Sequence, residues 1–216
     1  MTRIARFPLS PESRRAIAQA IGEGSVMTYP TETSYALGGN ALEPGLCGRV
    51  QALKGRDVGK PLLLLVGSEE QAESLAPGIH PAARELMRRF WPGPLTLVFS
   101  ASPNVPPHLA TEQGTIALRW SPHPALAELI GMSGVPLIGT SANITGQPPL
   151  CTAEQVLAAF PGTIALAIDA GPAPGGPPST LVDTTVVPFR ILREGALPKP
   201  RIQATLVETF IETVPE

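Results

Sequence analysis

The sequence predicts an α/β protein in which a twisted, mixed β-sheet is flanked by helices. Short apolar runs, typical of buried strands, alternate along the 216 residues with segments whose apolar residues recur at helical spacing. Two strand-like runs near the C-terminus follow one another closely, as in a hairpin, so the sheet is expected to be mixed. In such folds the ligand-binding loops gather at one end of the strands.

The first half of the chain carries clear helix signals. Ser10 followed by Pro11 predicts a helix over residues 11–22, with serine as the N-cap. A second helix over 45–54 ends at Lys54 and Gly55, residue types that helix C-termini favour. The other elements expected here are strands at 25–30, 62–66, 95–100 and 115–119 and helices at 69–75 and 81–90.

The second half is expected to continue the alternation. A helix at 124–131 and a strand at 135–140 come first, and Thr152 with Gln155 then resembles a capping box that opens a helix to Phe160. A strand at 163–169 leads into 170–180, which is so rich in proline and glycine that we expect a loop. Segments 180–187 and 189–195 predict a closing hairpin, and the chain after Pro198 a short tail.

Composition restricts the classes of function. The net charge of −2 argues against a general nucleic-acid binder, so any site for a polyanion must be local. The longest apolar run, 61–66, is far shorter than the roughly 20 residues of a membrane span. Neither the two cysteines nor the three histidines have a metal-binding spacing, and no signal-peptide core is visible. We expect a cytoplasmic protein with reduced thiols, no membrane contact and no transition-metal site.

The segment "KGRDVGKP" forms a basic group, with Lys54, Arg56 and Lys60 just after a predicted helix. Such cations can bind a triphosphate, but on their own they are more typical of a solvated helix terminus. The stretch is not a P-loop, because it has one residue too few between its glycines and Pro61 where serine or threonine should bind Mg²⁺. Both interpretations stay open on these residues alone.

The loop "GTSANITG" places Ser141 after a strand, as a nucleophile elbow would. Asn143 stands where that motif requires glycine, and no histidine–acid pair is evident, so a serine hydrolase is improbable. The loop is either a structural turn or a site for phosphate or ribose oxygens.

Two arginines end apolar strands. Arg119 closes "TIALR" and Arg193 closes "FRILR", and an arginine in such a place must either reach solvent or meet an anion. Together with the basic stretch they favour a polyanionic ligand. The hydroxyls of "PSTLVDTT" are also typical of an edge strand.

Seven blocks, in this order, closely resemble the YrdC/Sua5 family of threonylcarbamoyl-AMP synthases, also called the TsaC family. They are "YPTETSYALG", "KGRDVGKPL", "WPGPLTLV", "TIALRWSPHP", "PLIGTSANITGQPP", "STLVDTT" and "ILREG", and they span roughly residues 10–196. The resemblance implies a YrdC-like (DHBP-synthase-like) fold with a concave basic groove. It also implies that L-threonine, bicarbonate or CO₂ and ATP give threonylcarbamoyl-AMP and pyrophosphate for N6-threonylcarbamoyladenosine in tRNA.

The resemblance also implies roles for residues at matching positions. Residues implied to hold threonine or its carbamate are Thr33, Arg119 and Ser179. Residues implied to grip the ATP phosphates are Lys54, Arg56 and Lys60, with Lys54 and Arg56 as the catalytic pair. Residues implied to hold the rest of the nucleotide are Thr115, Ser141, Asn143 and Arg193. Mg²⁺ would arrive with ATP rather than in a protein cage.

Some positions depart from the family pattern. Ser34 and Ala36 replace a common valine and glycine, and Leu65 stands where longer members have a histidine that helps to bind threonine. We therefore expect the short type, with a catalytic domain at 1–197 and only a tail at 198–216. Expected partners are the substrates, RNA or tRNA, and a downstream threonylcarbamoyl-transferase complex. The alternatives are a YciO-type paralogue and an RNA-binding module that uses the same groove without catalysis.

Overall fold

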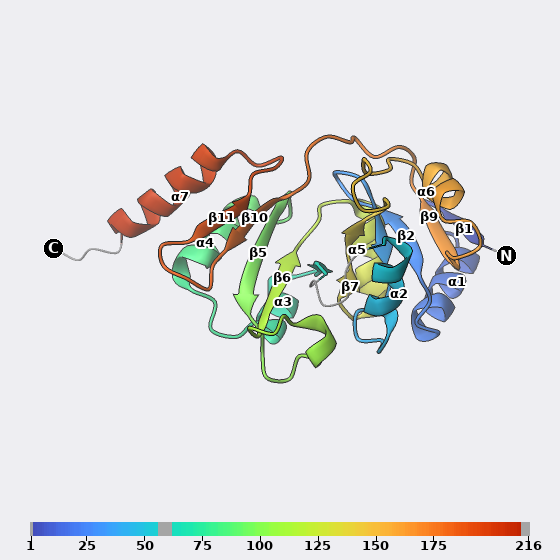
Figure 1. Cartoon of the computed structure of the whole chain (residues 1–216), viewed down its shortest axis with the longest axis horizontal. Helices are drawn as coiled ribbons and strands as arrows, with labels where there is room; N and C mark the ends of the chain where they lie inside the picture. Colours follow the sequence, from blue (N-terminus) through green and yellow to red (C-terminus); the bar gives the residue numbers. More distant parts are fainter. Residues whose placement is uncertain (1, 56–61, 213–216) are drawn as a thin grey trace.

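The computed structural model describes residues 2–55 and 62–212, and within them the strands form two mixed sheets with helices against them (Figure 1). The expected α/β class with mixed strand pairing is confirmed. The strands are divided between two sheets, however, whereas the sequence predicts a single sheet. None of the helices in the described ranges combines the length and the apolar composition that a membrane span requires.

The first sheet has five strands in the order β1-β9-β2-β3-β8. Their bounds are Arg3–Arg6, Leu166–Asp169, Met27–Pro30, Tyr35–Gly38 and Thr140–Ser141. β9 pairs in parallel with both β1 and β2, whereas β3 runs antiparallel to β2 and β8. The sequence did not predict β1 or β3, because β1 exposes three of its four residues and β3 lies inside a stretch rich in hydroxyls.

The second sheet has six strands in the order β11-β10-β5-β6-β4-β7. Their bounds are Arg190–Arg193, Thr180–Asp183, Leu95–Ser100, Thr115–Arg119, Leu64–Leu65 and Leu137–Ile138. β10 and β11 form the predicted antiparallel hairpin, with a register shift after Leu181. β10 also pairs in parallel with β5, so the C-terminal hairpin lies beside a strand from the middle of the sequence.

The helices follow their sequence signals closely. They are α1 (Pro11–Gly22), α2 (Leu46–Leu53), α3 (Glu69–Leu75), α4 (Pro81–Phe90), α5 (Pro124–Ser133), α6 (Ala153–Ala159) and α7 (Lys199–Glu212), with a short 3₁₀ helix at Pro107–Leu109. Ser10 caps α1 by accepting a hydrogen bond from the Ser13 N–H, at 3.1 Å. Thr152 caps α6 as predicted, but the Gln155 side chain accepts from the Cys151 N–H instead of closing a full capping box.

The apolar core is divided in the same way as the sheets. The larger cluster packs the second sheet and part of β3 against α2, α3, α4 and α6. The smaller one lies between the first sheet, α1 and α5. The tail helix α7 packs on α4, where Ile202 is fully buried and the Arg201 guanidinium lies 5.4 Å from the centre of the Phe90 ring.

The two sheets meet where a pair of glycines faces the turn between β7 and β8. The Ile138 N–H donates to the Gly39 carbonyl oxygen at 2.9 Å, and a Cβ at Gly38 would overlap the Ile138 carbonyl oxygen. Tyr29, fully buried, donates its hydroxyl hydrogen bond to that same carbonyl. The contact requires glycine at position 38, since any side chain would push the sheets apart.

Removing the Tyr29 hydroxyl should test how much this contact contributes. In Tyr29→Phe the buried Ile138 carbonyl loses a donor, so the free energy of unfolding should fall by about 1 to 2 kcal/mol. Urea denaturation of the variant and the wild type measures the difference. An unchanged midpoint would show that the hydroxyl contributes nothing to the junction.

Candidate functional site

A cavity of about 400 Å³ lies between the two sheets. Its walls come from β3 and β8 of the first sheet and from β4, β5, β6, β10 and β11 of the second. This size is typical of a small-molecule site. Among the predicted site residues, those that line it are Thr33, Thr115, Arg119, Ser141, Ser179 and Arg193.

The remaining predicted residues have different positions. Lys54 and Asn143 adjoin this cavity through Ser141, whereas Arg56 and Lys60 lie outside the described residues. Leu65, at the position where longer members of the resembled family have a histidine, lines the cavity and is the neighbour of Arg119 across β4 and β6. Ser34 and Ala36, which also depart from the pattern that the sequence resembles, line it as well.

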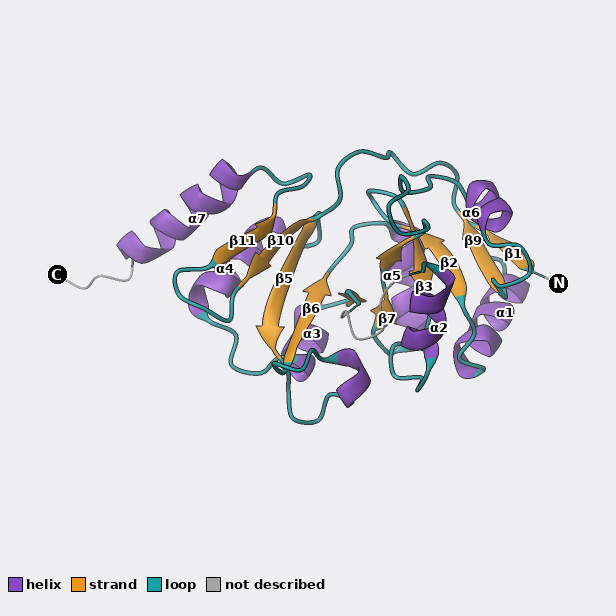
Figure 2. Cartoon of the chain, viewed as in Figure 1, coloured by secondary structure: helices purple, strands orange, loops and turns teal. Residues whose placement is uncertain are grey.

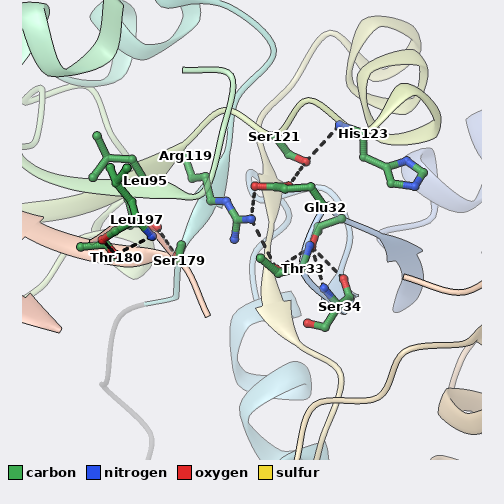
Figure 3. Close-up of polar contacts among 12 residues, drawn as sticks. Glu32, Thr33, Ser34, Leu95, Arg119, Ser121, His123, Ser179, Thr180 and Leu197 are labelled. Carbon is green, nitrogen blue, oxygen red and sulfur yellow. Dashed lines mark hydrogen bonds and ion pairs between the residues drawn. The ribbon is translucent and has the colours of Figure 1, made fainter. Parts of the chain in front are cut away.

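Arg119, the last residue of β6, is the buried cation of the cavity. Its side chain forms an ion pair with Glu32 and lies 3.4 Å from the Thr33 hydroxyl (Figure 3). Within the described part of the chain, its buried Nε has no hydrogen-bond partner. A buried donor without an acceptor is costly, so a ligand oxygen at this place would satisfy it.

Thr33 is held by a turn between β2 and β3. The Thr31 hydroxyl accepts hydrogen bonds from the Thr33 and Ser34 N–H groups, at 3.2 and 3.3 Å. Segment 170–179, which crosses from β9 to β10, adds a bond from the Gly175 N–H to the Thr33 carbonyl at 2.8 Å (Figure 2). The predicted loop therefore spans both sheets and holds the backbone of Thr33 at the cavity wall.

Ser179 and Arg193 meet on the opposite wall. The Ser179 hydroxyl lies 2.8 Å from that of Thr96, and the Ser179 carbonyl accepts from Arg193 Nη2 at 2.9 Å. The Thr115 hydroxyl oxygen lies 2.8 Å from the Thr111 hydroxyl oxygen. These contacts place hydroxyl groups and a second cation around the same space as Arg119.

Lys54 organises the loop after β8. Its ammonium donates to the Ser141 carbonyl, to the Asn143 carbonyl at 2.8 Å and to Asn143 Oδ1 at 3.0 Å. Lys54 is only 3% exposed, so the interpretation of this residue as part of a solvated helix terminus is wrong. The Thr145 N–H also donates to the Lys54 carbonyl at 2.9 Å, which ties the loop to the end of α2.

Glu32 and Ser121 belong to the site but were not singled out by the sequence. The Glu32 carboxylate accepts hydrogen bonds from both Arg119 and Ser121. In the sequence Glu32 is one polar residue of a hydroxyl-rich stretch, and its partners lie 87 and 89 positions away. The only available signal was the buried strand-end arginine, which needs an anionic partner.

The cavity suits anions better than metal ions. Among the residues described, no group of histidine, cysteine or acidic side chains could hold a metal ion. The titratable side chains on its described walls are Tyr35, Arg119 and Arg193. Burial raises the pKa of Tyr35, whose hydroxyl donates to the Gly171 carbonyl at 2.8 Å, so it stays protonated at neutral pH.

His123, which precedes α5, should make stability depend on pH. Burial lowers the pKa of His123, with the Glu32 charge opposing the shift, and its buried Nδ1 lacks a partner among the described residues. As the pH falls, the unfolded chain therefore binds more protons at His123 than the folded chain does. The contribution of His123 to stability is fully present above its unfolded-state pKa, about 6.5, and is lost as the pH falls below that value. His123→Asn should reduce the fall in melting temperature between pH 7.5 and 5.5, and an equal fall in both proteins would contradict this.

Comparisons with known proteins agree with this arrangement. A family model named Sua5_yciO_yrdC, described as "Telomere recombination", matches residues 19–195. A threonylcarbamoyl-AMP synthase of Pyrococcus abyssi is 40% identical over 197 residues, covering 91% of this chain and 58% of the relative. A threonylcarbamoyl-AMP synthase of Thiobacillus denitrificans is 38% identical over 160 residues, covering 74% of this chain and 85% of the relative.

Solved structures share the fold. The crystal structure of P. abyssi Sua5 complexed with L-threonine superposes with a TM-score of 0.88 at 38% identity, covering 95% of this chain and 60% of that one. E. coli YciO superposes with a TM-score of 0.81 at 23% identity, covering 91% and 97%, and shares the fold alone.

Proposed function

This chain belongs to the Sua5/YciO/YrdC family, and we propose that it is a threonylcarbamoyl-AMP synthase, a nucleotidyltransferase that uses ATP, L-threonine and bicarbonate or CO₂. The observation that carries the proposal is Arg119, a buried arginine whose Nε has no partner among the described residues, at a cavity lined by Thr33 and Ser179. The chain spans 58% of the length of the P. abyssi relative.

Threonine would bind with its carboxylate at Arg119, because a guanidinium is suited to carboxylates. The hydroxyls of Thr33 and Ser179 line the same space and can hydrogen-bond the polar groups of the amino acid. Leu65 adds an apolar wall that suits the threonine methyl group. One methyl group supplies only about 1 to 3 kcal/mol of discrimination, so we expect slow use of serine.

ATP would bind beside threonine. Ser141 and Asn143, held by Lys54, and then Thr115 and Arg193 would contact the nucleotide. Arg56 and Lys60 would grip the phosphates, with Lys54 and Arg56 nearest the reaction. Since no carboxylate is among the described residues that line the cavity, Mg²⁺ would arrive bound to ATP and keep part of its water shell.

The reaction needs positioning and charge neutralisation rather than a protein nucleophile. The threonine amine adds to CO₂ and loses a proton, which gives a carbamate. A carbamate oxygen then forms a bond to the α-phosphorus, and the bond to pyrophosphate breaks. Arginine and lysine side chains would neutralise the charge on the phosphates, and a magnesium ion brought with ATP would supply further positive charge there. A cavity closed to water would protect the unstable carbamate.

Pyrophosphate release tests the proposal. The purified protein is incubated with ATP, Mg²⁺ and bicarbonate, with and without L-threonine, and the products are analysed by mass spectrometry. Release that depends on threonine, together with the carbamoyl-adenylate, is expected. Nucleotide binding without release would indicate a YciO-type paralogue, and salt-sensitive RNA binding without release an RNA-binding module.

The organisation of the chain and its cellular context extend the proposal. We place the catalytic domain at residues 1–197 and treat 198–216 as a tail. A product that serves N6-threonylcarbamoyladenosine formation requires a transferase complex that acts on tRNA, and a cytoplasmic location would give the enzyme access to ATP and tRNA.

A further inference from the structure

The Glu32 carboxylate forms a bridge beside the cavity. One of its oxygens accepts a hydrogen bond from Arg119 Nη2 and the other from the Ser121 hydroxyl (Figure 3). Its side chain is 17% exposed, and it is not among the described residues that line the cavity. Glu32 therefore faces the arginine and the serine rather than a ligand in the cavity.

The bridge connects Arg119 to the start of α5. The His123 N–H donates to the Ser121 hydroxyl oxygen at 3.3 Å, Ser121 donates to Glu32, and Glu32 accepts from Arg119. A guanidinium is planar and its N–H groups have fixed directions, so holding Nη2 also sets the direction of Nε. The Nε that the bridge orients is the buried donor for which the described part of the chain offers no acceptor.

Glu32 could instead compete with a ligand for Arg119, and the geometry argues against competition. Glu32 contacts Nη2, whereas nothing in ranges 2–55 and 62–212 hydrogen-bonds Nε, so a ligand oxygen can bind there without displacing Glu32. Before a ligand arrives, Glu32 also compensates the buried charge of Arg119, which would otherwise be costly.

We propose that Glu32 is a positioning residue that acts through Arg119 and, anchored by Ser121, orients the arginine toward the carboxylate of the amino-acid substrate. This inference rests on the proposed function, because it assumes that threonine binds at Arg119. It assigns a role in substrate recognition to a residue that does not contact the substrate.

Steady-state pyrophosphate release, with threonine or ATP varied separately, tests the inference. In Glu32→Gln the KM for threonine should rise about tenfold, because the amide loses the charge and one acceptor, while the KM for ATP stays within about twofold. Ser121→Ala should raise the KM for threonine about threefold, since Glu32 then loses its anchor. The control is Glu128→Gln, whose carboxylate pairs with Arg14 at 2.8 Å between α1 and α5, and it should behave as the wild type.

Several outcomes would overturn the inference. An unchanged KM for threonine would show that Glu32 does not orient Arg119, and a lower one would show competition. Equal rises in both KM values would indicate a general structural role. If Glu32→Gln does not fold, Ser121→Ala decides by the same criteria. A folded wild type without threonine-dependent release would overturn the proposed function as well, whereas an active wild type with an unaffected Glu32→Gln overturns this inference alone.

Discussion

Arg119→Lys should lose nearly all threonine-dependent pyrophosphate release, with kcat/KM lowered by roughly 10²- to 10³-fold. Lysine keeps the positive charge, but it replaces a planar fork by a single ammonium on a flexible chain. That ammonium cannot hold both Glu32 and a substrate carboxylate in the geometry that Nη2 and Nε provide. Because the charge that compensates Glu32 remains, the variant should still fold.

The matched control is Arg190→Lys. Arg190 also pairs with a carboxylate, that of Asp183 at 3.2 Å, but its side chain is 65% exposed. Such a pair contributes little, so this variant should keep wild-type kinetics. If Arg119→Lys retained a kcat/KM within a few-fold of the wild type, with threonine still required, the placement of the substrate carboxylate would be wrong.

Lys54→Met should have the second largest effect, on stability as well as activity. Methionine fills a similar volume but leaves the carbonyls of Ser141 and Asn143 and the Asn143 side chain without their ammonium donor. We expect the free energy of unfolding to fall by about 2 to 4 kcal/mol. We also expect pyrophosphate release to be lost under conditions where the variant is still folded, because the loop would no longer hold its shape.

Urea denaturation and pyrophosphate release measure the two effects separately. Lys199→Met is the control, since Lys199 is exposed at the start of α7, and it should change neither quantity. A Lys54→Met protein with wild-type stability would mean that other groups hold the loop. Full activity in that variant would remove Lys54 from the proposed catalytic pair.

Most helices could be predicted because their signals are local. Ser10 and Pro11 set the start of α1, and α3 and α4 have the bounds that the sequence predicts. The pairing of strands is not local. β7 and β8 lie in one continuous run, yet Gly139 separates them and each joins a different sheet. Their separation depends on the close approach of Gly38 to Ile138, which no pattern within the run reveals.

Part of the cavity lining was predictable to a similar degree. Arg119 could be identified because a charged residue that ends an apolar strand needs a partner, and the motifs located Thr33, Ser141 and Ser179. The burial of Lys54 could not be predicted, since its acceptors are mainly backbone carbonyls of a distant loop. Every residue has a backbone carbonyl, so the residue types of a sequence do not show which carbonyl will accept a hydrogen bond.

The parallel pairing of β1 with β9 has a consequence for synthesis on the ribosome. Next to these strands, Thr2 hydrogen-bonds Ile164, 162 residues further along the chain, and Ser179 and Arg193 follow later still. A nascent chain that folds from its N-terminus must hold its first strand without a partner until most of the protein has been translated. Contacts between residues so far apart in the sequence should make folding slow. The first sheet cannot be completed until β9 has left the exit tunnel, and the cavity cannot be completed until the C-terminal hairpin has followed.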